Sequence, residues 1–276
     1  MKENKKAGWM VVDIVLMLVV FFAIQMVVNA VVGLIYGMVN HLETAELMRQ
    51  MAGGQLGSLV AASSVMSSLV TLVVYPRLKW TPIDRTYLRS RPWATLLWCV
   101  MLTLGTILPF EWVYEQLQLQ LSDSSQALFE SVMKEPWGYV ALGILAPVAE
   151  EFVFRGGILR TLLARMGNRS HWIAIALSAL IFGAVHMNLA QGVHGFVMGL
   201  LLGWLYYRTG SMAPGIIVHW INNSVAYLMF AIMPSMADGK LIDLFHGSQR
   251  MMLWGVLCSL CILIPSLLQV ALRTKK

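Results

Sequence analysis

Charged residues are scarce in this sequence: they make up 12% of its 276 residues, whereas hydrophobic residues make up 58%. A soluble domain carries about 25% charged residues, and a soluble chain this apolar would expose large hydrophobic patches that soluble proteins avoid. Bilayer hydrocarbon removes that difficulty, because a surface that faces lipid should be apolar. The shortage of charge therefore excludes an ordinary soluble domain and predicts an integral membrane protein.

Cysteine is also rare, and the three cysteines present, Cys99, Cys258 and Cys261, all fall inside apolar stretches. Cys258 and Cys261 form a CxxC pair, but no neighbouring basic residue is there to activate a thiol. We interpret all three as small apolar side chains rather than as a redox or metal-binding motif.

Eight apolar stretches are candidates for membrane-spanning helices, each of which needs about 20 mostly apolar residues. They are Trp9–Met38, Leu56–Tyr75, Ala94–Trp112, Trp137–Leu163, Trp172–Met187, Val193–Tyr207, Met212–Met233 and Met252–Leu272. The first is too long for the apolar region of a signal peptide, so we interpret it as a span. The pattern predicts an all-α, polytopic transmembrane helical bundle with about eight spans. Two mixed stretches, Leu42–Gln55 and Glu115–Lys134, are either interfacial amphipathic helices or loops.

Basic residues are distributed unevenly between the two sides of this predicted bundle. With the N-terminus placed inside, the inner segments hold 15 basic residues and the outer loops hold four: Arg49, Lys134, Lys240 and Arg250. Such an asymmetry follows the positive-inside rule. It predicts that both termini are cytoplasmic, and it explains the net charge of +6 without a nucleic-acid partner.

Polar side chains that are expensive to place at membrane depth gather in three of the predicted spans. The motifs are EEFVFR, FGAVH and HWINN, which contain Glu150, Glu151, Arg155, His186, His219, Asn222 and Asn223. Since intramembrane ionisable groups usually serve a function, we predict a functional site in this half of the chain.

Helical geometry separates the roles of the two adjacent glutamates. Arg155 lies four residues after Glu151, on the same helix face, so these two side chains are expected to form an ion pair. Glu150 points about 100° away and has no partner in its own helix. Glu150 is therefore our candidate general base, with Glu151 and Arg155 as its support.

The position of His186 follows from the symmetry of a helical hairpin. Residues 150 and 186 are equidistant from the turn signal at Gly167-Asn168. Residues equidistant from the turn of an antiparallel hairpin lie at the same depth. We therefore expect His186 beside Glu150, with a water molecule held between them.

The last motif offers neutral hydrogen-bond donors. His219 and Asn223 are four residues apart on one helix face, an arrangement that suits an oxyanion site, and Asn222 lies near that face. His219 lies less deep in its span than His186 does in its own, so tilted or staggered helices must close an offset of about 10 Å. We interpret His194 as a structural hydrogen-bonding residue.

The order EExxxR, FxxxH, HxxxN, with each motif in an apolar helix, resembles the CAAX protease and bacteriocin-processing family, also called CPBP or Abi. The resemblance covers about Trp137–Met229. It implies an intramembrane endopeptidase similar to type II CAAX prenyl proteases. In such an enzyme Glu150 and His186 position the attacking water, while His219 and Asn223 stabilise the oxyanion.

The resemblance also bears on cofactors and substrates. Members of the family have been called metalloproteases, and the zinc ligands here would be Glu150, His186 and His219. No HExxH is present, although these residues could still hold zinc. We favour a glutamate mechanism without a cofactor, because the asparagine is a poor zinc ligand. The implied partners are membrane lipids and a membrane-associated protein or peptide substrate, as in CAAX processing, bacteriocin maturation or self-immunity. We expect the protein to lie in a bacterial plasma membrane.

The chain divides into N-terminal transmembrane helices (1–135), a catalytic core (136–232), and an outer loop with a C-terminal transmembrane helix (233–276). Two other functions stay open. A non-catalytic immunity or scaffold protein of the same fold would be expected to lose Glu150 or a motif histidine, and all are present. A proton-coupled transporter would be expected to show paired broken helices in two repeats, and the sequence shows no repeat.

Overall fold

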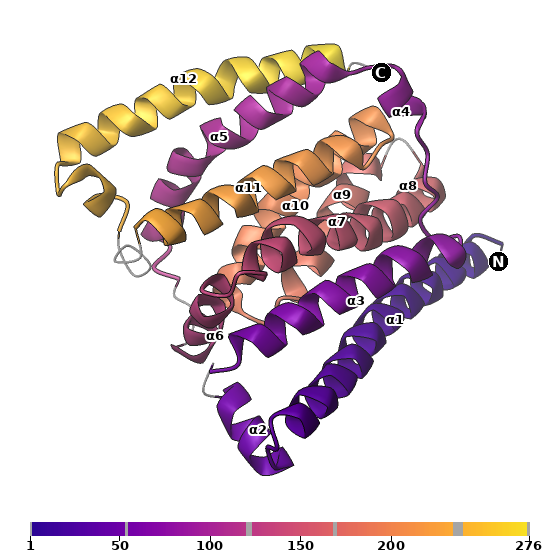
Figure 1. Cartoon of the computed structure of the whole chain (residues 1–276). Helices are drawn as coiled ribbons and strands as arrows, with labels where there is room; N and C mark the ends of the chain where they lie inside the picture. The colour runs from indigo at the N-terminus through magenta and orange to yellow at the C-terminus, as the bar shows by residue number, and fades with distance from the viewer. Residues whose placement is uncertain (1, 53–54, 120–122, 168–169, 234–239, 275–276) are drawn as a thin grey trace.

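The computed structural model describes residues 2–52, 55–119, 123–167, 170–233 and 240–274, and every regular element within these ranges is a helix (Figure 1). Six of the described helices are long and apolar enough to cross a membrane. They are α1 (Lys2–Val39), α3 (Gly57–Arg77), α5 (Trp93–Gln116), α10 (Leu189–Thr209), α11 (Ala213–Ile232) and α12 (Gln249–Arg273). The chain is thus an integral membrane protein with an all-α, polytopic bundle, as the composition predicts.

The fourth and fifth predicted spans are also helical, but they differ from the other six. The fourth is a composite of η1 (Tyr139–Leu145), α7 (Ala146–Glu151), η2 (Phe152–Leu159) and α8 (Arg160–Met166), which follow one another without a break.

 Two parts of this composite helix, η1 and η2, are π-helical. The fifth is α9 (His171–Ala184), whose 14 residues span about 21 Å, less than the roughly 30 Å of bilayer hydrocarbon. The count of eight spans therefore stays a prediction.

The turn between α8 and α9 lies where the sequence places it. Gly167 ends α8 with a φ of +75°, a left-handed conformation that favours glycine. Asn168, the other residue of the predicted turn, lies outside the described residues.

The two mixed outer stretches, for which helices and loops stay open in the sequence, both contain helices. These are α2 (Thr44–Ala52) and α6 (Asp123–Met133), while α4 (Thr86–Arg89) and η5 (Asp243–Phe245) are single short turns. Short polar-apolar helices at the ends of longer spans fit the interfacial alternative.

The composite helix lies in the middle of the bundle. Figure 1 shows α7 between α11 on one side and α3 on the other, with α5 and α12 beyond α11 and α1 beyond α3. The first turn of α1 and the last turn of α12 lie at the same end of the bundle in this view. This arrangement surrounds the segment that carries both glutamates with other helices.

Apolar side chains cover the outward faces of the outermost helices. On α1, Val27 and Leu34 are each 62% exposed, and on α12, Leu268 is 58% exposed. Water would disfavour such surfaces and lipid accepts them. Cys258 and Cys261 are exposed on α12, Cys99 is buried, and all three are free thiols, so no disulfide joins them.

Candidate active site

The segment that carries both glutamates is an unusual helix, because the short α7 lies between the π-helices η1 and η2. π turns are rare and often occur at functional sites. Side chains from other elements donate hydrogen bonds to three of its carbonyl groups. The pairs are Asn223 Nδ2 to Leu142 O (3.0 Å), Thr81 Oγ1 to Phe152 O (2.6 Å) and Ser178 Oγ to Phe154 O (3.3 Å). These bonds hold the composite helix in one position against its neighbours.

Glu151 and Arg155 form the ion pair that their spacing predicts. Arg155 Nη1 lies 2.7 Å from Glu151 Oε1, and the two side chains are 1% and 0% exposed. The guanidinium also donates to Gly199 O through Nη2 at 3.4 Å and lies 4.5 Å from the centroid of the Phe182 ring. Arg155 therefore ties η2 to both α9 and α10.

The other oxygen of Glu151 faces α11 at a glycine. A Cβ atom added at Gly215 would lie 2.6 Å from Glu151 Oε2, so a larger residue there would collide with the carboxylate. Within the described residues, Oε2 has no hydrogen-bond partner, and neither has Arg155 Nε. The absence of a side chain at Gly215 is what lets α11 approach the buried carboxylate.

His219 lies between the two glutamates. Its Nδ1 is 3.4 Å from Glu151 Oε1, and its Nε2 is 3.6 Å from Glu150 Oε2. An ionised carboxylate only accepts hydrogen bonds, so Nδ1–H donates to Glu151, whereas 3.6 Å is too long for a hydrogen bond. The Glu150 side chain is 24% exposed. One carboxylate is thus buried and paired, and its neighbour remains accessible.

His186 follows the end of α9, where it caps its own helix. Its Nδ1 lies 2.8 Å from Phe182 O, one of the carbonyl groups that the helix end leaves without a backbone partner. A carbonyl only accepts, so Nδ1 carries the proton, and Nε2 of the neutral ring keeps a lone pair. His186 and His219 both lie edge-on to the Phe182 ring, with ring centroids 5.2 Å and 5.8 Å from it.

The predicted contact between Glu150 and His186 is not direct. Among the described residues, no hydrogen bond or ion pair joins these two side chains, and the histidine that lies beside Glu150 is His219. Because the predicted arrangement places a water molecule between Glu150 and His186, the lack of a direct bond does not test it. A water molecule shared by Glu150 and His186 stays a prediction.

The two asparagines of α11 are hydrogen-bonded to each other. Asn222 Nδ2 donates to Asn223 Oδ1 at 3.2 Å, while Asn223 Nδ2 donates to Leu142 O. A side-chain amide has two N–H donors, so Asn223 keeps one for another acceptor. Its role as an oxyanion donor stays a prediction.

The zinc arrangement considered from the sequence does not fit this geometry. In the part of the chain that the structure describes, no group of three His, Cys, Asp or Glu side chains could hold a metal ion. Both ring nitrogens of His219 face carboxylates, and Nδ1 of His186 faces a carbonyl. We therefore derive no step through a metal.

Close packing of α9 on α10 was not anticipated, although the sequence carries its signal. Gly195, Gly199 and Gly203 repeat every four residues on α10, the small-residue spacing that lets membrane helices approach closely. A Cβ atom at Gly199 would lie 2.9 Å from the Cα of Ala179, and one at Gly195 would lie 3.5 Å from the His186 ring. The glycines thus leave room for α9 and for the histidine that follows it.

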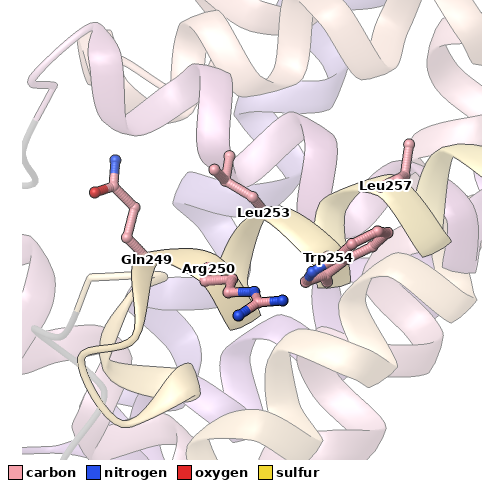
Figure 2. A pocket seen from close by; sticks show the side chains of 5 residues that line it. All are labelled: Gln249, Arg250, Leu253, Trp254 and Leu257. Carbon is pink, nitrogen blue, oxygen red and sulfur yellow. The ribbon is translucent and has the colours of Figure 1, made fainter.

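Two hollows differ in their relation to these residues. One of about 600 Å³ lies on α12 and is lined by Gln249, Arg250, Leu253, Trp254 and Leu257 (Figure 2). It contains none of the candidate site residues, and we assign it no part in the chemistry. A smaller cavity of about 80 Å³ is lined in part by His194 and Asn222.

Comparisons with known proteins agree with the resemblance seen in the motifs. Residues 133–225, which include every candidate site residue, match the model of the family described as type II CAAX prenyl endopeptidase Rce1-like. The resemblance to the CAAX protease family is thereby confirmed over this segment. No solved structure matches this chain.

Two curated proteins are similar to the chain. A Bacillus subtilis (strain 168) protein, named "Putative membrane peptidase YdiL", is 28% identical over 108 residues, which cover 39% of this chain and 43% of that protein. A Staphylococcus aureus (strain USA300) protein, named "Membrane-embedded CAAX protease MroQ", is 27% identical over 146 residues, which cover 52% of this chain and 59% of that protein. The similarity spans about half the length of these relatives.

Proposed function

We propose that this membrane protein, whose residues 133–225 match the Rce1-like endopeptidase family, is an intramembrane endopeptidase of the glutamate type. The observation that carries the proposal is the unequal treatment of two adjacent carboxylates. Glu151 is fully buried and paired with Arg155, whereas Glu150 is partly exposed beside His219. Hydrolysis needs an accessible base, and a buried ion pair alone would not explain the second glutamate.

The proposed reaction uses one water molecule and protein groups. Glu150 removes a proton from the water, and the water oxygen attacks the carbonyl carbon of the scissile peptide bond. The proton then passes to the leaving amine as the carbon–nitrogen bond breaks, which gives a carboxylic acid and an amine. His186 orients the water through Nε2, since its Nδ1–H is held by Phe182 O.

His219 and Asn223 complete this scheme as donors to the developing oxyanion. Asn223 has one N–H left after its bond to Leu142 O. The Nδ1–H of His219 donates to Glu151, which orients the ring so that Nε2 faces the side of Glu150. Since Nδ1–H is used in this way, His219 donates to the oxyanion through Nε2–H, in the form of the ring that carries both protons. Glu151 and Arg155 support the reaction by holding His219, without touching the substrate.

The substrate we propose is a membrane-associated protein or peptide, processed at a CAAX-type sequence or as a bacteriocin-like peptide. The names of the matched family and of the Staphylococcus aureus relative support this class. We place both termini in the cytoplasm, on the strength of the 15-to-four distribution of basic residues. We place the protein in a bacterial plasma membrane because both similar curated proteins come from bacteria.

Cleavage by purified protein in liposomes tests the proposal. The probes are two quenched fluorescent peptides that end in the same CAAX sequence, one farnesylated and one not. We expect the wild type to cleave at least one of them and Glu150→Gln to lose about 10²–10⁴-fold in rate, the contribution of a general base. Glu130→Gln, on the exposed part of α6, is the matched control and should retain wild-type activity. Equal rates for wild type and Glu150→Gln would refute the proposal.

A further inference from the structure

The smaller cavity lies between three helices at the edge of the candidate site. Its volume is about 80 Å³, and α5, α10 and α11 all contribute to its wall. The lining side chains are Thr106, Ile107, Phe110, His194, Val197, Met198, Leu201 and Asn222. Most of this wall is apolar, with a small number of polar groups, which is typical of a ligand-binding pocket.

His194 is the polar group of this wall that the reaction above does not use. Its ring lies edge-on to Phe110, with ring centroids 5.0 Å apart, and more loosely against Tyr114. None of the hydrogen bonds found among the described residues involves either ring nitrogen of His194. The structural hydrogen bond expected from the sequence is therefore not found within those residues, and the ring has donor capacity to offer a ligand.

The cavity adjoins the candidate catalytic residues on two sides. Asn222, in its wall, donates to Asn223, one of the proposed oxyanion donors. On the α10 side, the residue after His194 is Gly195, and the His186 ring lies 3.5 Å from the Cβ position of that glycine. A chain whose scissile bond lies at Glu150 and His186 would thus have this cavity next to it.

The volume of the cavity restricts its occupant. Small-molecule sites usually measure about 300–1,000 Å³, far more than is present here. An apolar cavity of about 150 Å³ holds benzene, which has six carbon atoms. A cavity of about 80 Å³ therefore holds roughly three or four carbon atoms. This matches one aliphatic side chain the size of valine and excludes a whole prenyl chain.

We propose that this cavity is a specificity subsite that takes the aliphatic side chain next to the scissile bond, and that His194 donates a hydrogen bond to the backbone carbonyl of the same substrate residue. The inference rests on the proposed endopeptidase function. The apolar wall accounts for the choice of side chain, and the unpartnered imidazole accounts for how the substrate backbone is held beside it.

Cleavage of a peptide library by the purified protein in liposomes tests this subsite. The library is built on whichever of the two fluorescent CAAX peptides the wild type cleaves faster, and it varies only the two residues that flank the cleaved bond. Mass spectrometry identifies the products. Ile107→Ala enlarges the cavity, and Leu104→Ala is its matched control, since Leu104 lies on the same helix, does not line the cavity and is 41% exposed. His194→Phe keeps an aromatic ring against Phe110 and removes both nitrogens.

We expect the wild type and Leu104→Ala to favour small aliphatic residues at one flanking position. Ile107→Ala should raise the relative kcat/KM for larger residues there by about tenfold or more. His194→Phe should raise KM about 2–10-fold with little change in kcat, as the loss of one hydrogen bond predicts. If Ile107→Ala has the wild-type profile, the subsite is overturned and the endopeptidase stands. If the wild type cleaves no peptide, both proposals fail.

Discussion

Removal of Arg155 is the most informative change to the site, because its side chain makes three separate contacts. The guanidinium pairs with Glu151 at 2.7 Å, donates to Gly199 O at 3.4 Å and lies 4.5 Å from the centroid of the Phe182 ring. Arg155→Ala would remove all three contacts. It would also leave the Glu151 carboxylate, which is 0% exposed, without its cation.

The expected cost follows from that burial. Breaking a buried ion pair by removing one partner costs about 3–5 kcal/mol, because the remaining charge is left uncompensated. Such a loss is a large part of the roughly 5–15 kcal/mol that stabilises a typical protein. We therefore expect Arg155→Ala to lower the free energy of unfolding by about 3–5 kcal/mol and to lower activity as well, since Glu151 no longer orients His219.

Equilibrium unfolding by sodium dodecyl sulfate in mixed micelles, followed by circular dichroism, measures this loss. Arg49→Ala, in the exposed Glu46–Arg49 pair of α2, is the matched control and should unfold like the wild type. The double change Glu151→Leu with Arg155→Met should recover most of the stability and none of the activity, because both buried charges are then absent. The reasoning is wrong if Arg155→Ala unfolds at the same detergent fraction as Arg49→Ala.

Three other predictions follow from single contacts. Gly215→Ala should cost about 1–3 kcal/mol in the same unfolding titration, since its Cβ atom would collide with Glu151, whereas Gly33→Ala, with only an ordinary contact at 3.8 Å, should be neutral; equal effects would contradict this. Asn223→Ala should lower kcat about 10²–10³-fold and leave measurable cleavage, so an unchanged kcat would remove it from the oxyanion site. A reporter active only in the periplasm, fused after Lys276, should stay inactive; activity would refute the cytoplasmic C-terminus.

The positions of the helices could be predicted closely from the sequence, because the thickness of the bilayer sets the length of each apolar stretch. The predicted span Leu56–Tyr75 corresponds to α3 at Gly57–Arg77, for example. The ion pair between Glu151 and Arg155 could be predicted for a similar reason. It depends only on spacing within one helix, and no tertiary packing is needed to bring the residues together.

The neighbour of Glu150 could not be predicted in this way. It depends on how α7, α9 and α11 pack together, which includes rotations that hairpin symmetry leaves free. Helix α9 ends at Ala184, so His186 lies in the following turn and bonds to Phe182 O, while His219 occupies the place between the carboxylates. The glycine at 215 that permits this approach carries no distinctive signal in the sequence.

The π-helical segments have a consequence for how the chain tolerates changes in length. A π turn holds more residues than an α turn. Deletion of one residue from the part of η2 beyond Arg155 would let this stretch return to the ordinary α-helical repeat, which largely keeps the direction of the side chains that follow. Deletion of one residue from α8, which is already α-helical, would instead rotate the side chains beyond it by about 100°. The composite helix should therefore tolerate the loss of one residue within its π-helical part better than the same loss within α8.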